Sequence, residues 1–161
     1  MYGLNILLQS FQLKNNLFNK TDKIRVSITT MPDENKEHFV IEAKKINNIH
    51  HFFNVNISKN TTKIIFVFRK KNYLQNDPII ASTIVSINQL PKSATDSSNT
   101  EMKNINIYEP LQNNKNFCFA NQSRRVFGQM QIQFTPTDSF SVASFKDAYN
   151  NPKKNQRKSA K

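Results

Sequence analysis

Residues 62–91 restrict the fold of this chain more than any other segment. Residues 62–68 alternate β-branched and aromatic side chains, a cationic stretch follows at residues 69–71, and a second apolar run begins after an Asn-Asp-Pro turn at residues 76–78. Such runs, separated by turn-forming residues, are typical of two strands joined by a long loop. The segment therefore predicts a β fold.

The rest of the chain repeats this pattern. With 13 Phe, only 2 Gly and no Trp, the composition favours half-buried strands. Eight strand candidates follow one another at near-regular spacing, which predicts an all-β, eight-stranded antiparallel β-sandwich. The expected strands lie near residues 3–10, 23–30, 37–43, 51–57, 62–68, 79–87, 105–109 and 126–134.

A change of composition near the C-terminus predicts one domain with a tail. We expect the sandwich to occupy residues 1–137 and a flexible basic tail to occupy residues 138–161, where there is little apolar surface to offset the entropy of ordering. The tail is interpreted either as a solubilising extension or as an electrostatic docking arm. Its candidate docking residues are Lys153, Lys154, Arg157, Lys158 and Lys161.

The charge balance limits the choice of partner. A formal net charge of +12 and a pI near 9.9 point to an acidic protein surface, phosphate groups or anionic lipid. The chain lacks a long apolar run and the ordered regions of a secretory signal, so an intracellular, cytoplasmic location is expected, with cytoskeletal or membrane association as options.

Catalytic and cofactor motifs are absent from the sequence. The histidines are His38, His50 and His51, and a structural role is expected for the adjacent pair. The lone Cys118 lies between two phenylalanines and resembles a small buried hydrophobe more than a nucleophile. No phosphate-binding glycine loop, nucleophile elbow or zinc spacing occurs, so no enzyme activity, cofactor, metal or small-molecule substrate is predicted.

Three segments together resemble the C2 domain family over roughly residues 4–134. The text LKNNLFNKTDKIRVSI at residues 13–28 follows that family's first loop and second strand. The text NIHHFFNVNIS at residues 48–58 resembles the Asn-Pro-x-Phe-Asn start of a strand. The text RRVFGQMQIQF at residues 124–134 resembles the closing strand with its internal glycine. The resemblance implies the same β-sandwich and a role in binding membranes or proteins.

The resemblance also identifies where calcium-binding members carry carboxylates. Those five positions correspond here to Asn16, Asp22, Arg69, Lys71 and Asp77, whose formal charges sum to zero. Calcium needs about six to eight oxygen ligands, usually with several carboxylates among them. We therefore predict no functional calcium site, and we expect the two remaining aspartates to act as turn formers.

Cations near these loops are the candidate binding residues. Such groups could bind phosphates or acidic side chains, with arginine offering a bidentate fork, although a solvated loop is an equally simple interpretation. Two neighbouring side chains, Tyr73 and Leu74, could insert into an interface. The cations of this set are Lys20, Lys23, Arg69, Lys70 and Lys71, and a secondary basic face comprises Lys36, Lys44 and Lys45.

The resulting hypothesis is a non-catalytic, calcium-independent C2-like module. A structural or adaptor subunit that binds an acidic protein surface in a multiprotein assembly ranks first. Peripheral binding to anionic phospholipid membranes through the basic loops is the alternative. Nucleic-acid binding ranks last, because the aromatic and basic motifs of RNA-binding sheet folds are missing.

Overall fold

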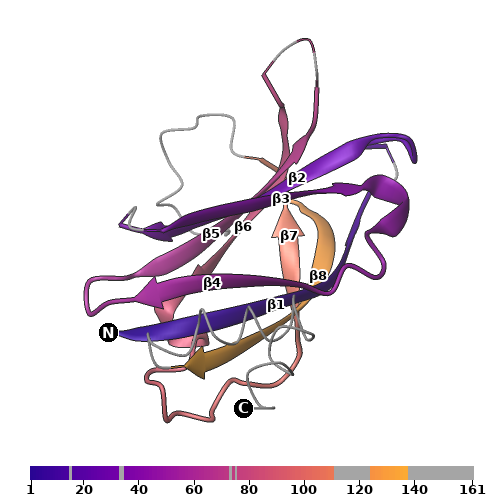
Figure 1. The fold of residues 1–161 in the computed structure, drawn as a ribbon. Coiled ribbons are helices and arrows are strands. Elements are labelled where there is room, and N and C mark those ends of the chain that lie inside the picture. The colour runs from indigo at the N-terminus through magenta and orange to yellow at the C-terminus, as the bar shows by residue number, and fades with distance from the viewer. Residues whose placement is uncertain (15, 33–34, 73, 75, 111–123, 138–161) are drawn as a thin grey trace, which may run out of the picture.

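The computed structural model describes the chain except for residues 15, 33–34, 73, 75, 111–123 and 138–161. The described residues form the predicted all-β fold, with eight antiparallel strands (Figure 1). No helix among them is long and apolar enough to cross a membrane. The predicted tail and Cys118 lie outside the described residues.

The first half of the sandwich is a four-stranded sheet whose register fixes which loop residues lie close together. Lys23 of its second strand lies opposite Glu42 of its first, and Arg25 lies opposite Arg69. In sheet order the strands are β3 (Lys36–Glu42), β2 (Lys23–Met31), β5 (Lys63–Lys70) and β6 (Ile79–Ser86).

The second half is joined to the first by a single residue pair, Ser82 with Tyr108. Because this junction is so short, the chain of eight strands folds into two layers that face each other (Figure 1). In sheet order the strands of this half are β7 (Lys103–Tyr108), β8 (Val126–Thr137), β1 (Tyr2–Leu13) and β4 (His51–Ile57).

Alternating side chains from both layers make the core. Phe11 of β1 meets Phe68 of β5 edge to face at 5.0 Å, and Phe53 of β4 meets Phe66 of β5 at 6.4 Å. These four rings are fully buried together with Phe134 of β8. The period-two burial explains why the phenylalanine-rich segments form strands with one face inward.

The sandwich is closed by side chains where the edge strands β3 and β4 meet. Phe39 of β3 stacks on His51 of β4 at 4.1 Å, and the Glu37 carboxylate accepts a hydrogen bond from the Asn54 amide N–H at 3.2 Å. His51 is half-buried here, whereas His50 is exposed and hydrogen-bonds the Gln9 side chain at 2.8 Å. The adjacent histidines thus have the structural surroundings expected from the sequence.

The connections β1–β2, β3–β4 and β5–β6 lie at one end of the sandwich together with the end of β7 and the start of β8, and we call this end the loop end. The β3–β4 connection begins with the short helix η1 (Ala43–Lys45). Backbone hydrogen bonds join neighbouring connections: Ala43 N–H donates to the Asp22 carbonyl at 2.9 Å, and Lys71 N–H donates to the Lys23 carbonyl at 2.8 Å. The loop end is therefore a connected platform built on paired strands.

Candidate functional site

The loop end brings together cations from both predicted basic sets. Lys23 starts β2 opposite Glu42, and η1 places Lys44 and Lys45 directly beyond that pair. The hydrogen bond from Ala43 to Asp22 holds η1 against the β1–β2 connection that carries Lys20. Residues that the sequence assigned to two separate surfaces therefore share one surface.

The cationic stretch at residues 69–71 does not form the loop apex that the sequence predicted. Strand β5 continues through Lys70, two residues beyond the expected end, because Arg69 and Lys70 pair with Arg25 and Ile24 of β2. Neighbouring strand residues point to opposite faces. Arg69 accordingly lies on the outer face, where it donates to the Ser27 hydroxyl at 3.4 Å, while Lys70 turns toward Asp22.

The predicted secondary basic face is also divided. Lys36 begins β3 and the two η1 lysines follow its last residue, Glu42. A strand of this length spans about 20 Å at roughly 3.3 Å per residue. Lys36 is thus remote from the loop end, and it does not form one face with Lys44 and Lys45.

Two further predicted residues follow β5. Leu74 is 93% exposed, and its amide N–H donates to the Asn72 side-chain oxygen at 3.1 Å. Tyr73 lies outside the described residues, as do the five basic residues predicted to dock the tail. An exposed leucine at this position is an apolar contact available to a partner or an interface.

Both remaining aspartates at the calcium-related positions are engaged internally. Asp22 accepts the Asn19 amide N–H at 2.7 Å and pairs with the Lys70 ammonium at 3.5 Å. Asp77 accepts the Asn72 amide N–H at 2.8 Å. The aspartates make the turn-forming hydrogen bonds expected from the sequence, and a cation lies beside each of them.

The partner of Asp77 is a residue that sequence reasoning missed. Arg25 reaches across from β2 to Asp77 with an N–O distance of 3.3 Å, and the Asp77 side chain is only 12% exposed. This ion pair could not be predicted without knowing the register of β2 against β5, because nothing in the local sequence links residue 25 to residue 77. Within the described part of the chain, no group of three or more His, Cys, Asp or Glu side chains could hold a metal ion.

The other loop-end carboxylates are paired as well. Glu42 binds the Lys44 ammonium at 3.2 Å; that hydrogen bond and the charge of Lys44, followed by Lys45 and Lys23, lower the pKa of Glu42. Glu109 accepts the Arg125 backbone N–H and pairs with its guanidinium at 3.2 Å. The Arg125 backbone hydrogen bond is the main cause of the lowered pKa of Glu109.

Arg124 is a second arginine whose role the sequence did not reveal. It donates to the Ser82 hydroxyl at 2.7 Å and to the Glu109 carbonyl at 3.0 Å, and partial burial lowers its pKa. Ser82 belongs to the single residue pair between β6 and β7. Arg124 therefore helps to fasten the two layers where the backbone pairing is weakest.

Lys20 and Lys45 of the loop end form no direct ion pair among the described residues. Among the described residues, no carboxylate or hydrogen-bond acceptor contacts the ammonium of Lys20 or Lys45, and both side chains are exposed. The acidic groups around them are already paired with other cations, although the charge of Lys45 also acts on Glu42 from a distance. The loop end thus presents net positive charge to an approaching partner.

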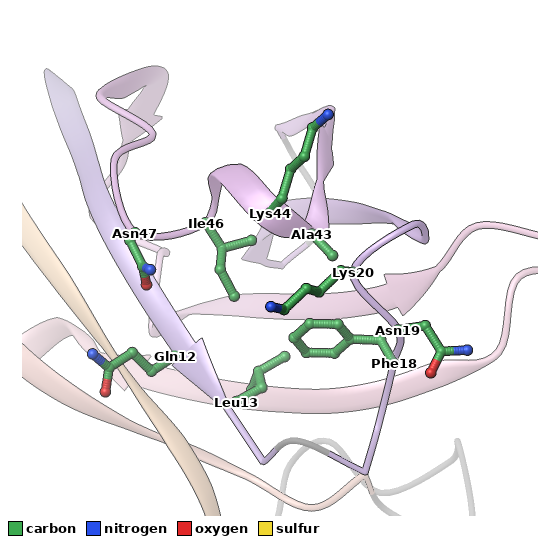
Figure 2. Close-up of a pocket in the computed structure, with 9 residues that line it drawn as sticks. All are labelled: Gln12, Leu13, Phe18, Asn19, Lys20, Ala43, Lys44, Ile46 and Asn47. Carbon is green, nitrogen blue, oxygen red and sulfur yellow. The ribbon is translucent and has the colours of Figure 1, made fainter.

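A cavity of about 780 Å³ opens beside these lysines, between β1, the β1–β2 connection and η1 (Figure 2). Its apolar lining consists of the buried Leu13, Ala43 and Ile46 and the half-buried Phe18. Its polar lining consists of Gln12, Asn19, Lys20, Lys44 and Asn47. No local sequence pattern indicates this cavity, because its walls come from three separate segments.

Comparison with solved structures identifies the architecture. A C2 domain of a plant extended synaptotagmin 1 superposes with a TM-score of 0.58 at 9% identity, covering 85% of this chain and 95% of that chain. The fold is that of a C2 domain. A C2 domain-containing protein aligns with a TM-score of 0.57 at 12% identity, covering 85% of this chain and 89% of the other.

A third solved structure with a similar fold is that of CC2D1B, which superposes with a TM-score of 0.58 at 14% identity. The alignment covers 83% of this chain and 54% of the CC2D1B chain, so this protein spans about half the length of that structure. No family model matches the sequence, and no curated protein matches it. The predicted C2-like fold is confirmed, and at these identities the likeness concerns the fold alone.

Proposed function

We propose that this chain is a calcium-independent, non-catalytic interaction module whose loop end binds an acidic protein surface in a structural or adaptor role. The observation that carries the proposal is the internal pairing of Asp22, Glu42, Asp77 and Glu109, which leaves an excess of exposed lysines at the loop end. A surface of net positive charge accelerates and orients the approach of an acidic partner.

Calcium independence follows from the same ion pairs. A calcium ion would have to compete with Lys70 for Asp22 and with Arg25 for Asp77, and it would sit among further cations at residues 69–71. Two carboxylates also supply fewer oxygens than the six to eight that calcium takes. The internal cations thus hold the loops in place of a bound metal.

We therefore expect millimolar calcium to leave the melting temperature of the protein unchanged, within the reproducibility of differential scanning fluorimetry. The reason is that the two aspartates are already neutralised by Lys70 and Arg25. Magnesium at equal concentration controls for ionic strength. A calcium-specific rise in melting temperature that a chelator reverses would contradict this prediction.

Peripheral binding to anionic membranes is the second candidate. It is favoured by Leu74, which is 93% exposed in the β5–β6 connection, close in sequence to the cations at residues 69–71. An exposed apolar side chain beside lysines suits the boundary between headgroups and acyl chains, where each surface cation contributes about 1 kcal/mol. This candidate shares the loop end with the first, so the two can be compared on the same variants.

A charge-matched pair of double variants tests the proposed surface. Lys20→Ser with Lys45→Ser removes two exposed cations from the loop end, and Lys59→Ser with Lys92→Ser removes two exposed cations elsewhere. Tagged full-length protein is purified from cells, and the proteins and lipids recovered with it are measured for each variant. We expect the loop-end double to weaken recovery of an acidic partner about tenfold and the distant double less than twofold, since local charge positions a bound partner.

Three outcomes would count against the proposal. Equal losses from both doubles would mean that diffuse charge alone drives association. Recovery with anionic vesicles, abolished by Leu74→Ser, would favour the membrane candidate. Recovery with RNA that nuclease removes would favour nucleic acid. Melting temperatures of all variants are compared with the parent protein, so that loss of fold is not mistaken for loss of binding.

A further inference from the structure

The loop-end cavity combines an apolar floor with the ammonium of Lys20. Leu13 and Ile46 are each 8% exposed and Ala43 is 5% exposed, so the floor is made by side chains that are anchored in the core. Figure 2 shows Lys20 extending over Phe18, with its ammonium directed toward the space between Leu13 and Ile46. Lys44 points away from that space, and its ammonium is held by Glu42 at 3.2 Å.

The cavity is held open by backbone hydrogen bonds. Phe11 N–H donates to the Ile46 carbonyl at 3.0 Å, and Ala43 N–H donates to the Asp22 carbonyl at 2.9 Å. These bonds attach η1 and its following residue to β1 on one side and to the β1–β2 connection on the other. A site whose walls are fixed before binding loses less conformational entropy when a ligand enters.

We propose that this cavity takes a bulky apolar side chain of a partner protein that is followed in sequence by an acidic residue. The apolar side chain contacts Phe18, Leu13 and Ile46, and the adjacent carboxylate pairs with Lys20. The inference rests on the proposed function, which it deepens by naming the chemistry of the recognised segment. A volume of about 780 Å³ accommodates such a side chain with part of its peptide backbone.

The rim of the cavity favours a peptide over a lipid. Gln12, Asn19 and Asn47 line the opening with amide groups that can both donate to and accept from a peptide backbone. Among the described residues, the exposed large apolar side chains are Met1, Val40, Leu74, Met102 and Val126, and none of them lines this cavity. A site that opens toward acyl chains would carry apolar side chains at its mouth.

The test uses the full-length protein and three synthetic peptides. The first, acetyl-Gly-Phe-Asp-Asp-Gly-amide, carries the proposed chemistry; in the second the phenylalanine is serine, and in the third both aspartates are asparagines. Binding is followed by NMR titration of backbone amide shifts. We expect saturable shifts at Leu13, Phe18 and Ile46 with the first peptide only, since the apolar and acidic groups contribute together.

Protein variants separate the cavity from general charge. Lys20→Gln should weaken binding of the first peptide about tenfold, because the ammonium that pairs with the peptide carboxylate is lost. Lys59→Gln removes the same charge from an exposed lysine that lies outside the loop end and does not line the cavity, and it should change the affinity less than twofold. Phe18→Ser should weaken binding of the first peptide and leave amide shifts outside the loop end unchanged.

Distinct results would overturn the inference. Equal losses from Lys20→Gln and Lys59→Gln, or equal binding of the first and second peptides, would reject the cavity as the peptide site. Binding of phosphatidylserine vesicles that depends on Phe18, without peptide binding, would assign the cavity to a lipid. By contrast, the proposed function itself fails if the loop-end and distant double variants recover partners equally.

Discussion

Replacing Gly128 with alanine is expected to destabilise the protein by about 3 kcal/mol, because the added methyl group has no space. A Cβ at this position would lie 1.8 Å from the Gln12 carbonyl oxygen and 2.8 Å from its carbonyl carbon. Both atoms belong to the backbone of β1, which pairs with β8 from Gly3 to Leu13 with one register shift between Leu8 and Ser10. The neighbour cannot rotate away as a flexible side chain would, so the two strands must separate locally.

Urea unfolding of Gly128→Ala against the parent protein measures this cost. Gln129→Ala is the matched control, because Gln129 is exposed on the same strand and its truncation should change the free energy of unfolding by about 0.5 kcal/mol or less. The position adjoins Leu13, which lines the loop-end cavity, so amide shifts around that cavity should also move. A Gly128→Ala protein as stable as the control would mean that β1 and β8 are not packed this closely.

The sequence predicted the strands and their order along the chain with useful accuracy. Alternating apolar side chains specify each strand locally, and turn residues between them specify the connections. All eight expected strands are present, although β1 and β8 run longer than expected and β5 includes Arg69 and Lys70. The internal glycine of β8 was visible in the sequence. The sequence did not show why a glycine is needed there. The Gln12 carbonyl that approaches the glycine closely is remote in the chain.

The candidate site was less predictable, since it depends on register and on contacts between connections. Arg25 meets Asp77 only because β2 and β5 pair with Arg25 opposite Arg69. Lys20 and Lys44 approach one cavity because η1 is hydrogen-bonded to residue 22. Neither relation has a signature within a window of ten or twenty residues. The types of side chain in the site could be predicted from the sequence, whereas which of them lie together could be seen only in the fold.

The largest expected effect of a single truncation concerns Phe53, which we expect to cost about 3–5 kcal/mol when it is replaced by alanine. Phe53 is fully buried and contacts Phe39 at 5.5 Å, His51 at 4.8 Å and Phe66 at 6.4 Å between ring centroids. These partners come from β3, β4 and β5. Its removal would therefore leave a cavity where β3 and β4 meet, at a side of the sandwich that no backbone-to-backbone strand pairing closes.

The adjacent Phe52 provides a control of identical size. It lies on the opposite face of β4 and is half-buried, so Phe52→Ala should cost about 1 kcal/mol. Both free energies of unfolding can be measured in urea on the full-length protein. The sequence could not decide which phenylalanine faces inward, because a shift of one residue in strand register exchanges the two faces. In the structure Phe52 lies opposite Leu7 of β1. If both substitutions lowered the free energy of unfolding equally, or Phe52→Ala lowered it more, β4 would have to pair with β1 in a different register.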